Sequence, residues 1–325
     1  MNKMCAAMTL GLALVAGCAA APTSPGPAWP QHVLRADRVT LLNSPGGERF
    51  DASGLLWTKT GGLLTVNDRG PRLYRIETRP GGAEADLRPL ADCFTPEQLA
   101  PLAALKREHY DCEGIAQDEQ GRLYLCEELN RWILRCDPKT GRVERLPIDW
   151  APVRDLFSGV DPNASFEGIA IGDGKLYVAN ERTAALIIVV DLARMKVTGH
   201  FTVQPRKSSF FGTHYSDLSW FEGKLWVLCR QHRVVLEVNP RTHEVLAEYD
   251  YRELEDQLGY RTQFPVGIME GLAVDREFIW LATDNNGLER KGTRGDIRPA
   301  LVRCPRPDRR ESGRSNLHPP PSRGL

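Results

Sequence analysis

A phrase built on a Glu-Gly pair occurs three times in this chain, and a weaker form of it occurs twice more. The clear copies contain Glu113-Gly114, Glu167-Gly168 and Glu270-Gly271, each followed by an apolar run, a turn, a second apolar run and an acid. The weaker copies contain Ser53-Gly54 and Ser216-Asp217. The five starting positions are separated by 60, 54, 49 and 54 residues, and a regular period of about fifty residues is typical of a repeat architecture.

Each repeat contains about four short runs in which apolar and polar residues alternate, with turn sequences such as DEQG and DPKTG between them. Four antiparallel strands per repeat predict an all-β fold, a β-propeller. The fifth repeat lacks an outermost strand, whereas the run Arg38–Asn43 has no repeat of its own. We therefore expect five four-stranded blades, the last completed by this N-terminal strand. Six blades are the weaker alternative, because the insertion at 91–110 looks helical.

Two columns of side chains are expected at one mouth of the propeller, where the innermost strands begin and the second strands end. The first column contains Ser53, Glu113, Glu167, Ser216 and Glu270, and the second contains Asp68, Glu128, Glu181, Arg230 and Asp284. Seven acids and one base give a formal charge of −6 in a chain with 42 basic and 42 acidic residues. Since crowded carboxylates raise each other's pKa, either some are protonated, or water and backbone amides satisfy them, or a cation binds among them.

The phrases SGLLW, EGIA with LYLCEE, EGIA with LYVANE, and EGLAV with IWLATDN resemble the phytase-like (esterase-like) and SdiA-regulated family of exported bacterial β-propellers. The resemblance covers residues 38–305. It implies a propeller of five or six blades with an acidic, calcium-binding mouth, and it places metal ligands at Glu113, Glu167 and Glu270. The fourth repeat departs from the pattern at Ser216-Asp217 and at Arg230, so a complete ring of carboxylates is not expected there.

The donor types in the first column favour Ca²⁺, because they offer only oxygen and include no His or Cys. Ser53 and Ser216 can complete the coordination through water. The acids of the second column are expected in an outer layer around the ion or on a ligand-facing rim: Asp68, Glu128, Glu181 and Asp284. The alternative is that each glutamate of the first column caps backbone amides of the next blade. Four bases near the mouth can hold an anion or pair with neighbouring acids: Arg69, Arg182, His214 and Arg230.

The N-terminus reads as a processing and anchoring segment. Residues 1–17 combine an early Lys with an apolar stretch, as in a signal peptide, and LVAGC resembles the bacterial lipobox. We expect lipidation of Cys18, a Pro-rich tether over 18–36, the propeller over 37–305 and a disordered tail over 306–325. Because Ala19 and not Asp follows the cysteine, the expected location is the outer membrane, with the lipid at Cys18 as the membrane contact.

Six cysteines remain for an oxidising compartment once Cys5 leaves with the signal peptide and Cys18 carries lipid. Cys93 and Cys112 flank the insertion at 94–111 and are the expected disulfide. The other four lie in apolar runs and are expected to pack as small hydrophobic side chains: Cys126, Cys136, Cys229 and Cys304.

Two classes of function are compatible with the sequence, and a nucleic-acid partner is not expected, because the chain is neutral overall and lacks a basic cluster with interleaved aromatic residues. The first is a binding or scaffold module of the cell envelope, which recognises a protein, a glycan or a small molecule. The alternative is a metal-dependent hydrolase of phosphate esters, carboxylic esters or lactones. The sequence contains no GxSxG, HExxH or P-loop motif, so no catalytic residue is assigned.

Overall fold

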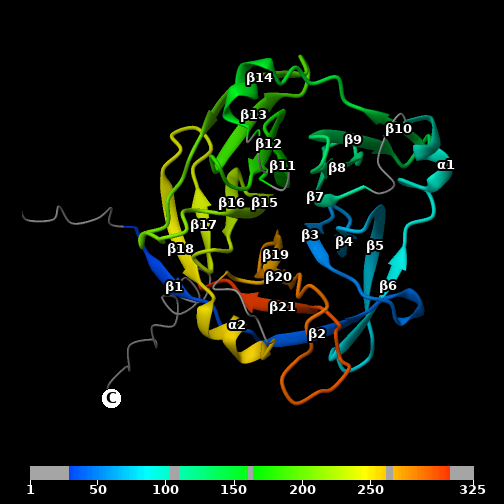
Figure 1. Ribbon diagram of the computed structural model, residues 1–325, viewed down its shortest axis with the longest axis vertical. Helices are drawn as coiled ribbons and strands as arrows, with labels where there is room; N and C mark the ends of the chain where they lie inside the picture. The colour runs from blue at the N-terminus through cyan, green and yellow to red at the C-terminus, as the bar shows by residue number, and fades with distance from the viewer. Residues whose placement is uncertain (1–28, 103–109, 158, 160–163, 261–265, 308–325) are drawn as a thin grey trace, which may run out of the picture.

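The computed structural model describes residues 29–102, 110–157, 159, 164–260 and 266–307. Antiparallel four-stranded sheets follow one another around a central axis, which confirms the predicted all-β propeller (Figure 1). The first three sheets comprise β3 (Ala52–Trp57), β4 (Leu63–Asn67), β5 (Gly70–Thr78) and β6 (Glu84–Pro89); β7 (Cys112–Gln117), β8 (Leu123–Glu127), β9 (Trp132–Asp137) and β10 (Arg142–Arg145); and β11 (Phe166–Gly172), β12 (Lys175–Asn180), β13 (Leu186–Asp191) and β14 (Lys196–Phe201).

The remaining sheets contain the N-terminal strands as well as the C-terminal ones. They comprise β15 (Tyr215–Phe221), β16 (Lys224–Cys229), β17 (Val234–Val238) and β18 (Val245–Asp250) with β1 (Gln31–Val33); and β19 (Met269–Val274), β20 (Phe278–Thr283) and β21 (Ala300–Pro305) with β2 (Arg38–Asn43). The helical segments are α1 (Pro96–Leu99), α2 (Arg252–Leu258) and the short 3₁₀ turns Pro45–Gly47, Ala100–Leu102 and Ala151–Leu156.

Strand β2 joins the two ends of the chain, as the sequence predicts. It pairs antiparallel with β21, with Thr40 opposite Leu301, and on its other side it pairs parallel with β6, with Leu42 opposite Ala85. The blue and red segments that meet in Figure 1 are these two ends. The pairing covers edges that would otherwise be exposed, and it makes the last and first sheets continuous.

The repeated Glu-Gly phrase lies at a β-bulge in each innermost strand. In β3, β7, β11, β15 and β19 the pairing with the second strand shifts register at this position. The glycines have no room for a side chain: a Cβ on Gly54 would lie 2.3 Å from the carbonyl oxygen of Glu113, and one on Gly168 would lie 2.4 Å from Cα of Asp217. The glycine of the phrase is therefore required because neighbouring innermost strands approach closely there.

Asp217 replaces this glycine in the fourth repeat, and its side chain connects three strands. Its fully buried carboxylate accepts hydrogen bonds from the backbone amides of Leu218 at 2.8 Å, Leu55 at 3.2 Å and Leu272 at 2.7 Å. These amides belong to β15, β3 and β19. Asp217 therefore links the innermost strands of three sheets near the axis.

The folded part of the chain extends into the predicted tether, 18–36, and into the predicted tail, 306–325. Residues 31–33, inside the predicted tether, form β1, which pairs parallel with β18, and the following Leu34 is buried. The outer edge of β18 offers unpaired backbone groups, and the chain that passes beside it satisfies them. Arg306, the first residue of the predicted tail, is also buried, with its guanidinium 5.1 Å from the ring centre of Trp226. The signal sequence and Cys18 lie outside the described residues.

The predicted disulfide between Cys93 and Cys112 is wrong. Cys93 is bonded to Cys136 with a Cα–Cα distance of 5.8 Å, whereas Cys112 is a buried free thiol. After β6 the chain crosses the outer strands of the next sheet, where Gln98 of α1 donates to the carbonyl of Gly141 at 2.7 Å. This path brings Cys93 to β9, while Cys112 lies on the innermost strand. Three cysteines are buried and free, as expected: Cys126, Cys229 and Cys304.

The insertion between β6 and β7 contains α1 and the 3₁₀ turn Ala100–Leu102 and no strand in its described part, 91–102 and 110–111. This agrees with the helical interpretation of its sequence. Helix α2 was not predicted; it follows β18 and buries Leu254 and Glu255.

Candidate functional site

Three glutamates from three sheets converge at the mouth. Glu113, Glu167 and Glu270 each occupy the second position of an innermost strand, and one carboxylate oxygen from each lies within 4.8 Å of the others. All three side chains are buried. The equivalent position in these three repeats thus faces the same point, and the structure brings together the residues predicted as metal ligands.

Burial and mutual repulsion act on these carboxylates. The pKa of Glu113 is raised well above its usual value, first by burial and then by the charges of Glu167, Asp111 and Glu128. The pKa of Glu167 is raised in the same way, first by burial and then by Glu128, while Arg230 and Arg182 oppose the rise. In the absence of a cation, the folded mouth therefore favours protonated glutamates.

In the part of the chain that the structure describes, the three glutamates have no backbone-capping role. Among the described residues, no hydrogen bond joins the side chain of Glu113, Glu167 or Glu270 to a backbone N–H, so this alternative finds no support in the structure. Asp217 fills the amide-capping role instead, through the three bonds described above.

Arg230 neutralises one side of the mouth. Its guanidinium forms ion pairs with Glu270 and, at 2.7 Å, with Glu181. Glu181 is fully buried and also pairs with Arg182, while Nδ1 of His214 lies 3.5 Å from its Oε1. Burial and the neighbouring arginines lower the pKa of His214 to about 4, so this imidazole is neutral near pH 7.

Asp68 and Asp284, two of the acids predicted for the outer layer, lie close to Asp51, near the first and last sheets. Asp284 lies near Asp51, and Arg49 pairs with Asp51 at 2.6 Å. Burial, followed by the charge of Asp284, raises the pKa of Asp51 to about 7. The pKa of Asp68 also rises to about 7, because of burial and then the charges of Asp51 and Asp111.

The two serines of the first column are used by the backbone. The hydroxyl of Ser53 donates to the carbonyl of Asp51 at 3.5 Å, and that of Ser216 donates to the carbonyl of Met269 at 3.4 Å. Both residues are buried. Each hydroxyl donates to a backbone carbonyl near the mouth, and its oxygen retains lone pairs that can accept a further contact.

Arg69 lies apart from the other three predicted anion-binding residues. Its side chain is half exposed, 3.9 Å from Asp51, and it lines a hollow of about 820 Å³ together with Arg49, Arg72 and Tyr74. Arg182, His214 and Arg230 gather instead around Glu181. The structure therefore divides the predicted bases between two places.

The three-glutamate group fits a hard divalent cation. Its donors are carboxylate oxygens only, and no ion pair among the described residues includes Glu113 or Glu167. Ca²⁺ accepts such ligands in flexible geometry, whereas softer metals prefer nitrogen or sulfur. Glu270 is already paired with Arg230, so a cation bound here would share this glutamate with the arginine.

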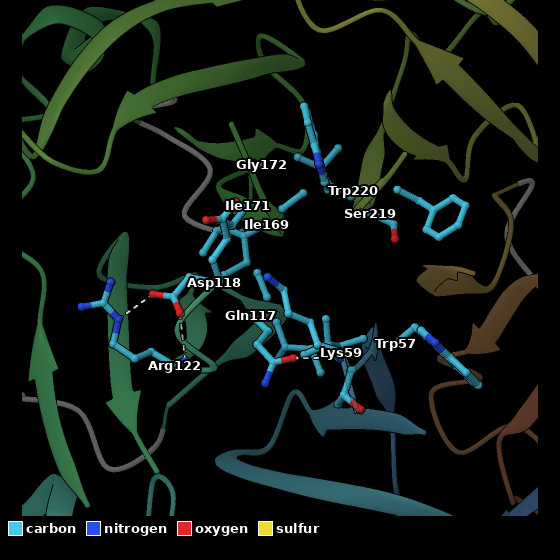
Figure 2. Close-up of a pocket in the computed structure, with 18 of the residues that line it drawn as sticks. Trp57, Lys59, Gln117, Asp118, Arg122, Ile169, Ile171, Gly172, Ser219 and Trp220 are labelled. Carbon is cyan, nitrogen blue, oxygen red and sulfur yellow. Dashed lines mark hydrogen bonds and ion pairs between the residues drawn. The ribbon is translucent and has the colours of Figure 1, made fainter. Parts of the chain in front are cut away.

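A second hollow lies at the opposite ends of the innermost strands. Its volume is about 630 Å³, and Figure 2 shows Trp57, Gln117 and Trp220 among the side chains around it. Gln117 accepts a hydrogen bond from the backbone of Lys59 at 3.0 Å, which connects two neighbouring sheets. The column residues of the mouth do not line this hollow, so the two faces of the propeller differ in chemistry.

Asp51 and Asp111 lie beside the acids of the mouth and were not predicted from the sequence. Each stands two positions before a residue of the first column, Ser53 or Glu113. Alternate residues of an extended strand point to the same side. An acid two positions before a residue of the first column is therefore a sequence pattern that could have predicted its place at the mouth. Asp217 was noted only as a departure from the pattern, since its bonds to other sheets depend on the closed ring.

No helix in the described part of the chain is long and apolar enough to span a membrane.

Comparisons with known proteins identify a family and a fold. The model of a family described as "Phytase-like: Esterase-like activity of phytase" matches residues 50–287. The crystal structure of Myxococcus xanthus glutaminyl cyclase is similar over 85% of this chain and 97% of its own, with 15% identity and a TM-score of 0.56. Virginiamycin B lyase from Staphylococcus aureus is similar over 78% of this chain and 65% of its own, with 13% identity and a TM-score of 0.40. No curated protein matches the sequence.

Proposed function

Because this chain belongs to the Phytase-like family, we propose that its acidic mouth binds Ca²⁺ and that the protein acts as a binding module of the bacterial cell envelope. The cation is held by Glu113, Glu167 and Glu270. The ligand is an envelope protein, a glycan or a small molecule that the mouth recognises through the bound cation and the bases beside it.

The observation that carries this proposal is the convergence of three buried carboxylates from three sheets. Burying a carboxylate without a proton donor or a cation is costly, and the cost rises when like charges lie nearby. A divalent cation offsets both the cost of burial and the repulsion between the carboxylates. Arg230 does so for Glu270, but the described residues supply no ion pair to Glu113 or Glu167.

The envelope location is part of the same proposal. A lipid at Cys18 holds the protein at the outer membrane, and the segment up to β1 spaces the propeller from the bilayer. More than one acyl chain gives stable anchoring, since each buried CH₂ contributes about 0.8 kcal/mol. Incorporation of labelled palmitate should disappear in Cys18→Ala, and label that persists in this variant would contradict the anchor.

A metal-dependent hydrolase of phosphate esters, carboxylic esters or lactones is the second candidate. The specific observation in its favour is the pair of arginines Arg182 and Arg230 beside the carboxylates, with the neutral His214 as a further hydrogen-bonding group, which suits an anionic substrate. A bound cation supplies Lewis-acid polarisation or an activated water. The buried serines Ser53 and Ser216 donate to backbone carbonyls, so a serine nucleophile is not part of this candidate.

Two measurements on the same preparation test these proposals. Calorimetric titration of the metal-depleted protein with Ca²⁺ should show binding that Glu167→Gln weakens by at least about tenfold and that Glu119→Gln, an exposed control on the opposite face, leaves unchanged. Hydrolysis of a panel of phosphate esters, carboxylic esters and lactones then separates the two functions. Ca²⁺-dependent turnover lost in Glu167→Gln favours the hydrolase, and Ca²⁺ binding without turnover favours the binding module. Absence of Ca²⁺ binding would contradict both.

A further inference from the structure

Two phenylalanines form the tip of the loop between β14 and β15. Phe210 is 98% exposed and Phe211 is 56% exposed, and their rings meet edge to face with 5.4 Å between centroids. They occupy the centre of a turn, in which the amide of Gly212 donates to the carbonyl of Ser209 at 3.2 Å. Among the described residues they are the most exposed large hydrophobic side chains. Because apolar area in water is unfavourable, such a tip is typical of an interaction surface.

The base of this loop is fixed to the propeller. Oγ1 of the buried Thr213 donates to Oε1 of Gln204 at 2.6 Å, which closes the loop over residues 204–213. The backbone amide of Arg206 donates to Oε2 of Glu248, on β18, at 2.8 Å. The loop therefore holds its aromatic tip at a defined place on the edge of the fourth sheet.

The same glutamate connects the loop with the first strand of the chain. Oε1 of Glu248 accepts a hydrogen bond from the side chain of Gln31 at 3.0 Å, and its backbone amide donates to the carbonyl of Pro30 at 3.0 Å. Figure 1 shows the segment between β14 and β15 turning beside the start of β1. Val33 of β1 is itself 51% exposed. The apolar tip thus lies at the edge of the propeller where the segment after Cys18 enters the fold.

Two bases of the loop have no acidic partner. Arg206 and Lys207 are exposed, and no ion pair among the described residues includes either side chain. Two acids of β18 lie beside the loop and are already bonded: Glu248 by the groups named above, and Asp250 by Arg252. The two positive charges are therefore available to an anionic group outside the protein.

We propose that the loop 204–213 is a membrane contact, in which Phe210 and Phe211 insert into the surface of a phospholipid bilayer. Arg206 and Lys207 lie four positions before these rings and bind the phosphates of the headgroups. Aromatic rings and bases on one loop match the two layers of this boundary, because the rings enter the acyl region while the charges stay with anionic headgroups.

The position of the loop also favours a bilayer as its partner. The chain from Cys18 to Trp29 spans at most about 40 Å when fully extended. A lipid at Cys18 therefore keeps the start of β1, and the loop beside it, close to the membrane surface. This step rests on the proposed envelope location, whereas the exposed rings and bases belong to the loop itself.

Vesicle binding without the lipid anchor tests the inference. The full-length chain with Cys18→Ala is sedimented with vesicles of phosphatidylglycerol and phosphatidylcholine. EDTA in the buffer removes any cation that would bridge the acidic mouth to the headgroups. Adding Phe210→Ser/Phe211→Ser should weaken binding by about tenfold or more, because the inserted apolar area is lost. The control Val39→Ser removes an exposed apolar side chain of β2 and should leave binding unchanged.

The bases are tested on the same vesicles. Arg206→Gln/Lys207→Gln should weaken binding by about fivefold for each charge removed, and it should have no effect on vesicles of phosphatidylcholine alone. Residues 1–17 are common to all these proteins, so the differences report on the loop. Circular dichroism verifies that each variant is folded.

Protection from a protease reports on the tip directly. Chymotrypsin cuts after exposed phenylalanines, and vesicles that contain phosphatidylglycerol should slow the cuts after Phe210 and Phe211, which mass spectrometry identifies. Equal vesicle binding with and without the two rings, or cuts that vesicles do not slow, would overturn the membrane contact. Loss of self-association in the serine variant, with vesicle binding unchanged, would instead assign the tip to a contact between copies of the chain.

Failure of this inference is distinguishable from failure of the proposed function. The vesicle experiment contains neither the lipid nor Ca²⁺, so a negative result leaves the anchor at Cys18 and the cation site standing. Conversely, palmitate label that persists in Cys18→Ala would contradict the anchor, whereas vesicle binding that depends on Phe210 and Phe211 would still support the loop as a membrane contact.

Discussion

Nη2 of Arg230 lies 2.7 Å from Oε1 of the buried Glu181, and the same guanidinium pairs with Glu270. The three residues belong to three different sheets. The fourth repeat thus contributes a base where the other repeats contribute acids. Arg230 supplies positive charge to Glu181 and Glu270, whereas Glu113 and Glu167 have no ion pair among the described residues.

Replacement of Arg230 by Gln should destabilise the metal-free protein and strengthen its response to Ca²⁺. Glu181 and Glu270 lose a buried charge partner, which costs about 3 kcal/mol in the free energy of unfolding. The more negative mouth attracts cations more strongly. Urea unfolding in EDTA and in Ca²⁺ measures both effects, and the exposed Arg241→Gln is the matched control. An unchanged Ca²⁺ response in a folded Arg230→Gln protein would contradict this role.

Asp217→Ala should lower the free energy of unfolding by about 3 kcal/mol or more, because three backbone amides lose their acceptor and each buried unsatisfied amide costs about 1–3 kcal/mol. Asp217→Asn keeps one acceptor oxygen and should be intermediate. The exposed Asp155→Ala is the control. Since Asp217 faces amides and not the proposed cation, Ca²⁺ affinity should remain unchanged. A loss of Ca²⁺ binding in folded Asp217→Asn would instead place this residue in the cation site.

The metal-free protein should become less stable as pH rises. The pKa values of Asp51 and Asp68 are raised to about 7 in the folded state, from about 4 in an unfolded chain. The folded state therefore binds more protons between these values, so the free energy of unfolding decreases as pH increases from about 4 to about 7. Urea midpoints in EDTA across this range measure the slope. The double variant Asp51→Asn/Asp68→Asn should make the slope shallower, while the other buried acids with raised pKa, such as Glu255, keep part of it. Midpoints that rise with pH in the wild type would contradict the assignment.

The bond between Cys93 and Cys136 closes a loop with a sequence separation of 43 residues, and its removal should cost about 3–4 kcal/mol. Peptide mapping without reductant should recover the peptides of these two cysteines as one linked species. Cys136→Ser should lower the urea midpoint, whereas Cys112→Ala should retain the linked species. Recovery of a Cys93–Cys112 peptide would favour the pairing expected from the sequence over the one in the structure.

Much of the fold follows from the sequence because the repeat makes each sheet a copy of the same local pattern. The Glu-Gly phrase places Glu113, Glu167 and Glu270 at equivalent positions, and ring geometry then brings them together. The pairing of β2 with β21 was also predictable, since the fifth repeat lacks a strand and Arg38–Asn43 has no repeat of its own.

The remaining features depend on contacts between segments that no repeat encodes. The bond of Cys93 with Cys136 is set by the path of the insertion over the outer strands. The parallel pairing of β1 with β18 occurs in a segment whose composition is that of a linker. The hydrogen bonds of Asp217 exist only when three innermost strands surround it, and the pairing of Arg230 with Glu270 likewise requires neighbouring sheets.

If the acids of the mouth bind Ca²⁺, the thermal unfolding of the protein must depend on the ion. EDTA should lower the melting temperature, and added Ca²⁺ should restore it in a concentration-dependent way, with about 2.7 kcal/mol of stabilisation when free Ca²⁺ exceeds its Kd by about 100-fold. Glu167→Gln should weaken this response, and Glu119→Gln should not. A melting temperature that is insensitive to both EDTA and Ca²⁺, in a protein that mass spectrometry shows to contain no metal, would contradict Ca²⁺ binding by these acids.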